Sequence, residues 1–376
     1  MMNRWIKCLS GIFLILIFIL AVNLMSGLIF SSPPEARSPI LPDLSESDPQ
    51  LPRVTVSQSF PFENMVVNLL VPVNISFLEK TKQQGILTSP SEDGSGSIHI
   101  ADIYRAMVSD PDQGQVFSDL INELRRVRQL QNLSDDEYLE LTAVYVQSLR
   151  YEPLKQDFAK FPLRTVVDSA GDCDDKSLLL AGLLAREGYS VALLSFEPEA
   201  HMAVGVGSYD YRYKETGYAF IETTNYSFIG EPTDKLEGNL TLHSYPIIII
   251  IGNGTKLYSS GNETQFIHDT YLITDQKLKE LASKLKILNE DLMAKQSRLS
   301  EMESNLDQLR NSDNILEYNS HVSAYTTLLS IYNNRLTSYR QLLTEYEKYA
   351  AIHDYIFERR YDRKGVYDYI KKNLPV

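Results

Sequence analysis

The stretch 171–185 constrains the fold of this chain more than any other part of the sequence. It opens with Gly-Asp-Cys-Asp-Asp-Lys and continues as a nearly unbroken apolar run. A helix that is apolar almost all round has to be buried, so the pattern predicts a central buried helix over 173–186. Glu187 and Gly188 follow, and a glycine after the last turn is a common helix end.

Cys173 stands at the first position of this predicted helix. The amides of a first helical turn and the helix dipole, worth about half a charge, favour the thiolate form of a cysteine there. Asp172 is the expected N-cap, with Asp175 three residues later. However, the charges of Asp172, Asp174 and Asp175 oppose a thiolate, so a nucleophilic Cys173 needs a cationic partner.

His201 and Glu222 are the candidates for that partner and for the group that orients it. His201 begins a predicted strand and Glu222 lies near the end of the next one, so both can converge on a cysteine at a helix start. The cysteine would be the nucleophile, the histidine would accept its proton and later return one, and the carboxylate would fix the ring tautomer. The amide of Cys173 is placed to contribute to an oxyanion hole.

Each of these residues also has a purely structural interpretation. A lone cysteine before an apolar helix is more often a small core residue, and a lone histidine would be a strand residue with a backbone hydrogen bond. Asp172, Asp174, Asp175 and His201 are conceivable metal ligands, but an Asp-x-Asp-Asp turn is usually a helix cap, so no metal is expected. No cofactor is expected either.

Helices precede strands in the middle of the chain. β-branched residues predict strands within 54–77, apolar spacing predicts helices within 100–150, and four further strands are predicted over 190–196, 201–206, 218–223 and 246–251. The isoleucine run in the last of these indicates a strand with both faces covered. Helices followed by an antiparallel sheet make the expected fold class α+β.

A heptad pattern occupies the last third of the chain. Leucine or methionine recurs at three- and four-residue spacing over 278–309, and a second series over 322–350 alternates tyrosine with aliphatic residues. A polar break at 311–314 separates them, so the pattern predicts an antiparallel coiled-coil hairpin over 274–352. Self-association through it is the minority interpretation. The tail, 353–376, is expected to cap the domain, with a basic membrane-contacting tail as the alternative.

The N-terminus predicts a membrane anchor. Arg4 and Lys7 precede an apolar run over 8–30, which is long enough to span a bilayer and longer than the core of a cleaved signal peptide. The positive charges put residues 1–7 in the cytoplasm and the bulk of the chain outside the cell membrane, beyond a Pro-rich linker at 31–53. Cleavage and release are the alternative. Six Asn-x-Ser/Thr sequons are consistent with an extracellular glycoprotein.

Composition limits the partners that the chain can have. The 376 residues carry a net charge of −13 at pH 7, whereas nucleic-acid binders show a basic surface, so no nucleic acid is expected. The two cysteines are Cys8, at the edge of the N-terminal apolar run, and Cys173. Their positions make a disulfide between them implausible, so Cys173 is expected to be a free thiol.

Three separated blocks of the sequence resemble the transglutaminase-like superfamily, in particular its archaeal and bacterial membrane-linked or secreted members. The blocks are Phe-Pro-Leu-Arg-Thr-Val-Val-Asp at 161–168 followed by Gly-Asp-Cys-Asp-Asp-Lys at 171–176, His-Met-Ala-Val-Gly-Val at 201–206, and Tyr-Ala-Phe-Ile-Glu-Thr-Thr at 218–224. The resemblance implies a papain-like domain over 54–262, with a central helix packed on an antiparallel sheet and a Cys-His-Asp site.

Carried onto this sequence, the resemblance implies Cys173 as nucleophile, His201 as base and Glu222 as the orienting carboxylate, where the superfamily more often has aspartate. The expected protein is a membrane-anchored, extracellular thiol enzyme that acts on peptide or amide bonds of a protein or peptide substrate through a Cys173 thioester. Hydrolysis is preferred to transfer onto an amine because no feature specifies an amine site. The alternative is an inactive cell-surface scaffold that uses the fold and the hairpin to bind partners.

Overall fold

The computed structural model of the chain describes five segments, 53–74, 100–153, 159–231, 241–311 and 315–374, all of which lie in one compact unit, Leu51–Val376. The predicted stub, anchor and most of the linker, residues 1–52, lie outside the described segments. Within these segments, no helix combines the length and the low polarity that a bilayer crossing requires. The membrane anchor at 8–30 therefore stays a prediction.

The predicted α+β class is confirmed, and helices precede the main sheet along the chain. The helices before the sheet are α3 (Ile100–Ser109), α4 (Gly114–Gln131), α5 (Asp135–Gln147), α6 (Pro162–Asp168) and α7 (Cys173–Arg186). The main sheet has strands β5 (Ser190–Phe196), β6 (His201–Gly207), β7 (Tyr218–Ile221) and β8 (Ile247–Asn253), in the order β7-β6-β5-β8 and antiparallel throughout.

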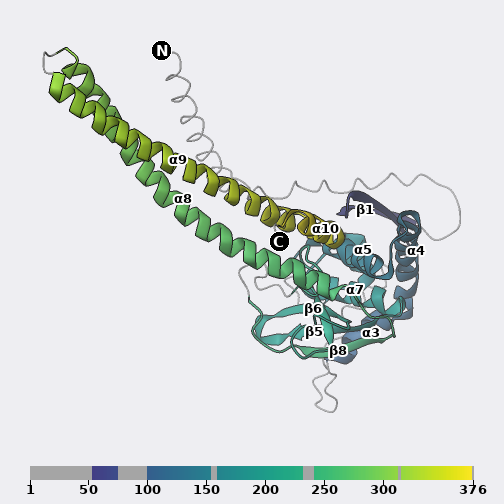
Figure 1. Cartoon of the computed structure of the whole chain (residues 1–376). Helices are drawn as coiled ribbons and strands as arrows, with labels where there is room; N and C mark the ends of the chain where they lie inside the picture. Colours follow the sequence, from purple (N-terminus) through teal and green to yellow (C-terminus); the bar gives the residue numbers. More distant parts are fainter. Residues whose placement is uncertain (1–52, 75–99, 154–158, 232–240, 312–314, 375–376) are drawn as a thin grey trace. The chain divides into compact units, whose positions relative to one another are not determined.

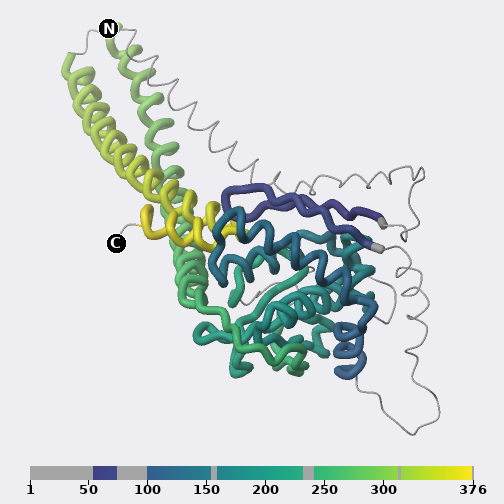
Figure 2. Tube along the Cα trace, turned by 90° about the vertical axis from the view of Figure 1, so that its right-hand side faces the viewer, coloured from purple at the N-terminus to yellow at the C-terminus, as the bar shows by residue number. Residues whose placement is uncertain are grey.

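Two smaller sheets accompany the main one. Strands β1 (Arg53–Phe62) and β2 (Met65–Asn74) form an antiparallel hairpin that packs on α4 and α5, and Figure 2 shows this ribbon beside the helices. The short strands β3 (Arg150–Tyr151) and β4 (Ala170–Gly171) pair in parallel and lead into α7.

Helix α7 is the buried centre of the domain, as predicted. One side packs on β5, β6 and β8, and the other sides pack on α3, α5 and α6 (Figure 1). Its leucines are fully buried. Gly182 lets α4 approach closely, because a Cβ there would lie 2.4 Å from the Phe117 ring. Gly188 follows the helix with φ of +85°, a conformation that glycine adopts without strain.

The isoleucine run forms β8, and the prediction that both faces of this strand are covered is wrong. β8 lies at the end of the strand order and pairs with β5. Ile249 is buried in the core shared with α7, whereas Ile248 and Ile250 are 40% and 45% exposed. Side chains alternate along a strand, so these two point away from α7.

The predicted helical hairpin is present as α8 (Gly261–Leu309) and α9 (Ile315–Glu358). Ion pairs join Lys277 to Glu345 and Arg335 to Asp291, so the two helices run antiparallel. The seam buries leucines of α8 and tyrosines of α9: Leu281, Leu292, Leu299, Tyr332 and Tyr339. α8 begins before the predicted residue 274, which leaves no linker between domain and hairpin. Most of the predicted turn, 312–314, lies outside the described residues.

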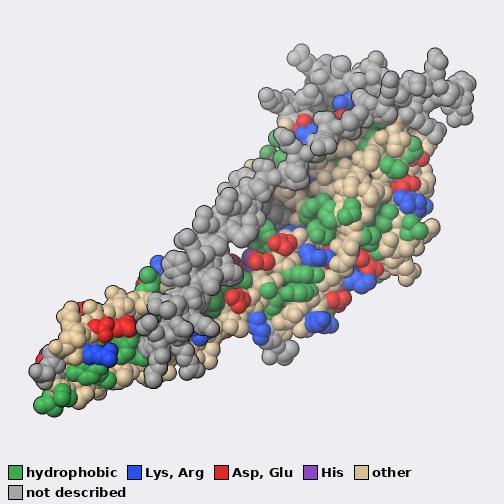
Figure 3. Space-filling view, turned by 90° about the horizontal axis from the view of Figure 1, so that it is seen from above, with side chains coloured by type: hydrophobic (Ala, Val, Ile, Leu, Met, Phe, Trp, Pro, Cys, Tyr) green, Lys and Arg blue, Asp and Glu red, His purple; other side chains and the backbone are tan. Residues whose placement is uncertain are grey.

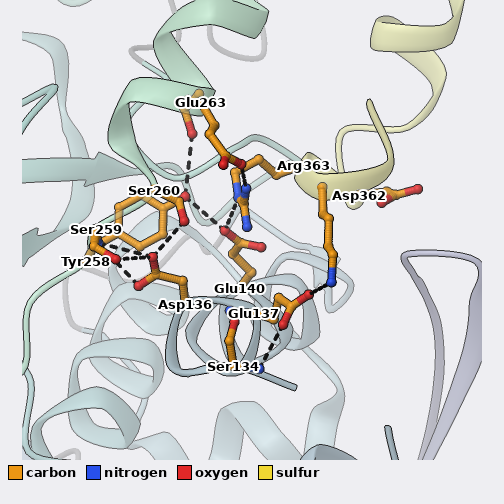
Figure 4. A network of polar contacts seen from close by, with 12 residues as sticks. Ser134, Asp136, Glu137, Glu140, Tyr258, Ser259, Ser260, Glu263, Asp362 and Arg363 are labelled. Carbon is orange, nitrogen blue, oxygen red and sulfur yellow. Dashed lines mark hydrogen bonds and ion pairs between the residues drawn. The ribbon is translucent and has the colours of Figure 1, made fainter. Parts of the chain in front are cut away.

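The C-terminal residues return to the domain as helix α10 (Arg363–Asn373), which packs on α8 and α9. Figure 4 shows the polar network that holds its start. The guanidinium Nε of Arg363 donates to Glu140 of α5 at 2.5 Å, and its Nη1 pairs with Glu263 of α8. Tyr258 also donates to Glu140, at 2.9 Å. The tail therefore caps the domain, as expected.

We expect the buried Arg363–Glu140 pair to be sensitive to the loss of one partner. An Arg363→Met variant should lower the free energy of unfolding by about 3–5 kcal/mol, because the Glu140 carboxylate stays buried without its cation. Adding Glu140→Gln should recover a large part of that loss, since the neutral amide can still accept from Tyr258. Urea denaturation of the full-length variants measures both effects. A double variant as unstable as the single one would contradict the explanation.

Candidate active site

A closed turn places Cys173 at the first position of α7. The carboxylate of Asp172 accepts the N–H groups of Asp174 and Asp175 at 3.2 Å each, and the carboxylate of Asp175 accepts the N–H of Asp172 at 3.2 Å. Asp172 is therefore the N-cap, as predicted, and Asp175 completes a capping box with it. Gly171 is required there, because a Cβ would lie 2.6 Å from the Cβ of Asp175.

The thiol of Cys173 is buried and protonated. Its Sγ donates to Oδ1 of Asp174 at 3.4 Å, and Oδ2 of that carboxylate accepts the hydroxyl of Tyr104 at 2.9 Å. Burial, and then the charge of Asp174, raise the pKa of the Cys173 thiol well above its usual range, although the N–H of Met202 acts in the opposite direction. The aspartates therefore oppose the thiolate, as the sequence indicated.

His201 and Glu222 form a buried pair at the ends of neighbouring strands. His201 begins β6, and Glu222 directly follows β7 rather than lying within it. The ring Nε2 of His201 lies 3.0 Å from Oε2 of Glu222. Oε1 of Glu222 accepts the N–H groups of Thr223 and Thr224 at 2.9 Å each and the Thr224 hydroxyl at 2.7 Å.

These donors keep Glu222 ionised. Burial alone would raise its pKa, but the hydrogen bond and charge of His201 and the donors of Thr224 outweigh burial, so the pKa of Glu222 lies below its usual value. With the carboxylate on Nε2, the other ring nitrogen of His201, Nδ1, is left for the thiol. The sequence predicted Glu222 as the group that orients His201, and this hydrogen bond is compatible with that role, which stays a prediction.

The structure brings Cys173 to the backbone N–H of Met202, the residue after His201, but shows no hydrogen bond between its Sγ and the His201 ring. Within the described segments, the polar contacts of Sγ are the Asp174 carboxylate and the N–H of Met202, the residue after His201. The predicted ion pair between Cys173 and His201 is therefore not formed in this state. Catalytic hydrogen bonds are often long or misaligned before substrate binds, so the geometry leaves the roles of both residues as predictions.

Sequence reasoning missed three residues around the site. Tyr104 holds Asp174, Gln147 donates to the carbonyl of Glu222 at 2.8 Å, and Lys176 is fully buried beneath the same segment. For Lys176 there was a signal, because a lysine within an otherwise apolar helix needs polar partners. Tyr104 lies in an amphipathic helical pattern and Gln147 in a largely apolar one, and neither pattern indicates that the residue contacts the site.

The aspartates at the start of α7 serve as caps. Asp175 is fully buried, and its carboxylate accepts the backbone N–H of Lys160 at 2.5 Å as well as that of Asp172. Burial and the charge of Asp172 raise the pKa of Asp175 to about 6. Among the residues that the structure describes, no three His, Cys, Asp or Glu side chains are grouped to hold a metal ion.

A groove of about 690 Å³ lies beside Glu222. Residues that follow β7 form one wall, and α8 and the end of α9 form the other. At its base the carboxylate of Glu231 accepts Arg360 at 3.0 Å and lies 3.6 Å from His268. Cys173 and His201 do not line this groove, so it reaches only the carboxylate end of the site.

Charged side chains of both signs are interspersed on the face of the molecule that Figure 3 shows, without a continuous basic surface among the described residues. Comparison of the chain with protein-family models, with curated proteins and with solved structures finds no match. The likeness to the transglutaminase-like superfamily therefore rests on the chain's own residues.

The low pKa of Glu222 predicts a pH-dependent contribution to stability. A carboxylate whose pKa is lower in the folded than in the unfolded chain stabilises the fold above the unfolded value, near 4.5, and this contribution is lost as the pH falls through the folded pKa. A Glu222→Gln variant should therefore be less stable than wild type by about 1.5–3 kcal/mol at pH 7, with the difference shrinking below about pH 4.5.

Urea denaturation between pH 3 and pH 7 measures this difference. An exposed Glu358→Gln variant is the matched control and should follow wild type at every pH. A Glu222→Gln penalty that does not change with pH would contradict an ionised, stabilising Glu222.

The contact with Asp174 predicts a second, separate effect on the thiol. Asp174→Asn removes a charge that raises the pKa of Cys173, so alkylation of Cys173 by iodoacetamide at pH 7 should become about tenfold faster for each unit by which this pKa falls. Asp168→Asn removes an acid that bonds Arg164 rather than the thiol, and it should leave the rate unchanged. Equal rates in the Asp174→Asn variant and wild type would contradict this assignment.

Proposed function

We propose that this protein is a thiol enzyme with a papain-like, transglutaminase-type core, which acts on peptide or amide bonds through a thioester on Cys173. The observation that carries the proposal is the buried His201–Glu222 pair near a cysteine at a capped helix start. Three further donors hold the Glu222 carboxylate of this pair. A buried histidine–carboxylate hydrogen bond that only stabilised the fold would not need to lie near the thiol.

The raised pKa of the Cys173 thiol favours a general-base mechanism over a preformed thiolate. Nδ1 of His201 accepts the proton of the Cys173 thiol as Sγ turns from Asp174 toward the ring, and the thiolate attacks the acyl carbon. The carbonyl oxygen gains the negative charge, and the N–H of Cys173 stabilises it. His201 then gives the proton to the leaving amine, and the thioester forms.

A second half-reaction releases the acyl group. Water attacks the thioester while His201 accepts its proton, and the carboxylic acid and the free thiol are restored. An amine in place of water would give a new amide bond. Glu222 stabilises the imidazolium in both halves and fixes the tautomer through Nε2. We retain hydrolysis as the preferred outcome, because no described side-chain group near Sγ is arranged to select an amine.

The location proposed for this chemistry is the outer face of a cell membrane, with residues 8–30 as the anchor and a protein or peptide of the cell envelope as the substrate. Exposed sequon asparagines agree with an extracellular location: Asn132, Asn225, Asn253 and Asn262. Neither a metal nor another cofactor takes part in the proposed reaction.

A surface scaffold is the second candidate function, and one observation favours it. The thiol is buried, protonated and bonded to Asp174, as a packing cysteine would be. In that case the hairpin α8–α9 would be the working part. Ile287 and Met293 are 65% and 53% exposed on its outer side, where a second copy of the hairpin could associate.

Acylation by 4-nitrophenyl acetate separates the two candidates. The full-length enzyme should release a burst of 4-nitrophenolate equal to the amount of Cys173, because the acyl group stays on the thiol until water attacks. Cys173→Ala should abolish the burst. His201→Ala should slow it by about 10²-fold or more, since the general base is lost.

His321→Ala, which removes a half-buried histidine of α9, is the matched control and should react like wild type. Absence of a burst throughout pH 5–9, or a burst that His201→Ala leaves unchanged, would contradict the enzyme proposal and favour the scaffold.

A further inference from the structure

We infer that Lys176 is a positioning residue for this site. Its buried ammonium group holds the segment that carries Glu222 against the helix that carries Cys173, and it thereby sets the orientation of the His201 ring. The inference rests on the proposed roles of Cys173, His201 and Glu222.

The ammonium group of Lys176 is surrounded by backbone carbonyls. Lys176 is fully buried, and its Nζ donates to the carbonyl oxygens of Leu149 at 2.8 Å, Gln147 at 3.2 Å and Thr224 at 3.3 Å. An ammonium group has three donors, and three acceptors from two separate segments receive them. One side chain of α7 thus joins the end of α5 to the segment after β7.

Thr224 transmits this anchoring to the histidine. Its carbonyl accepts from Lys176, while its N–H and hydroxyl donate to Oε1 of Glu222 at 2.9 and 2.7 Å. The other oxygen of Glu222 holds Nε2 of His201 at 3.0 Å. Two residues, Thr224 and Glu222, therefore connect the ammonium group of Lys176 to the His201 ring.

Gln147 makes a second, parallel connection. Its carbonyl accepts from Lys176, and its side-chain Nε2 donates to the carbonyl oxygens of Glu222 at 2.8 Å and Ser227 at 3.0 Å. The carboxylate of Glu222 is thus fixed through Thr224 and its backbone through Gln147. Both connections begin at the same ammonium group.

The choice of lysine points to positioning rather than to stability alone. Burial of an ammonium group is costly, and an apolar side chain would suit a helix that continues as an apolar run from Leu178. Without the cation, however, the carbonyls of Gln147, Leu149 and Thr224 would lose their common donor. Lys176 also lies one turn after Cys173 on α7, so the nucleophile and the anchor share one rigid element.

The Nε2–H proton of His201 reports on this arrangement directly. In a full-length chain with ¹⁵N-labelled histidine, the bond to Glu222 should give a downfield, slowly exchanging Nε2–H resonance. Lys176→Met should shift this resonance upfield and speed its exchange, and should slow acylation by 4-nitrophenyl acetate at least tenfold. Lys176→Gln retains N–H donors, so it should recover part of the resonance shift and part of the acylation rate. It is the variant to measure if Lys176→Met does not fold.

Leu179→Ala is the matched control, because it removes a buried side chain of α7 that cannot donate a hydrogen bond to the three carbonyls. It should destabilise the fold but leave the His201 resonance in place. A folded Lys176 variant with an unchanged resonance and unchanged acylation would overturn the inference. If wild type shows no acylation, the proposed function fails, whereas the resonance still decides whether Lys176 positions the His201–Glu222 pair.

Discussion

The reciprocal cap at the start of α7 is the interaction on which the rest of the structure depends. Asp172 and Asp175 satisfy each other's backbone donors, and Gly171 leaves room for the buried Asp175 carboxyl. A helix this deeply buried cannot use water for its first amides, so the cap has to come from its own residues. Because the cap fixes the first turn, it also fixes where Cys173 and Lys176 lie relative to the sheet.

The two parts of the candidate site differ: the His201–Glu222 pair is held by hydrogen bonds, whereas the Cys173 thiol is not bonded to this pair. Glu222 receives three donors on one oxygen and His201 on the other, and this concentration of donors overcomes the cost of burying a carboxylate. The thiol of Cys173 instead keeps its proton and donates a hydrogen bond to Asp174. Under the proposed function, this difference corresponds to a resting state in which His201 is oriented before the thiol turns toward it.

The C-terminal helices α8, α9 and α10 are attached to the same domain by buried polar contacts at both ends of the hairpin. Ser259 and Ser260, directly before α8, donate to Asp136 at 2.7 and 2.6 Å, and Arg363 at the start of α10 pairs with Glu140. Asp136 and Glu140 lie one turn apart on α5 (Figure 4). A single helix of the domain thus anchors both ends of the hairpin, a connection between residues far apart in sequence that no local pattern reveals.

The sequence by itself determined the elements whose signals are local: the capped, buried helix, the antiparallel strands after it and the two heptad helices. Each depends on spacing within one segment, and burial of the apolar positions then selects the predicted conformation. Only the tertiary structure decided that the isoleucines of β8 are partly exposed, that Sγ of Cys173 faces Asp174 rather than His201, and that Lys176 lies beneath Thr224. These outcomes depend on which distant segments pack against each residue, and the same local pattern is compatible with several such neighbours.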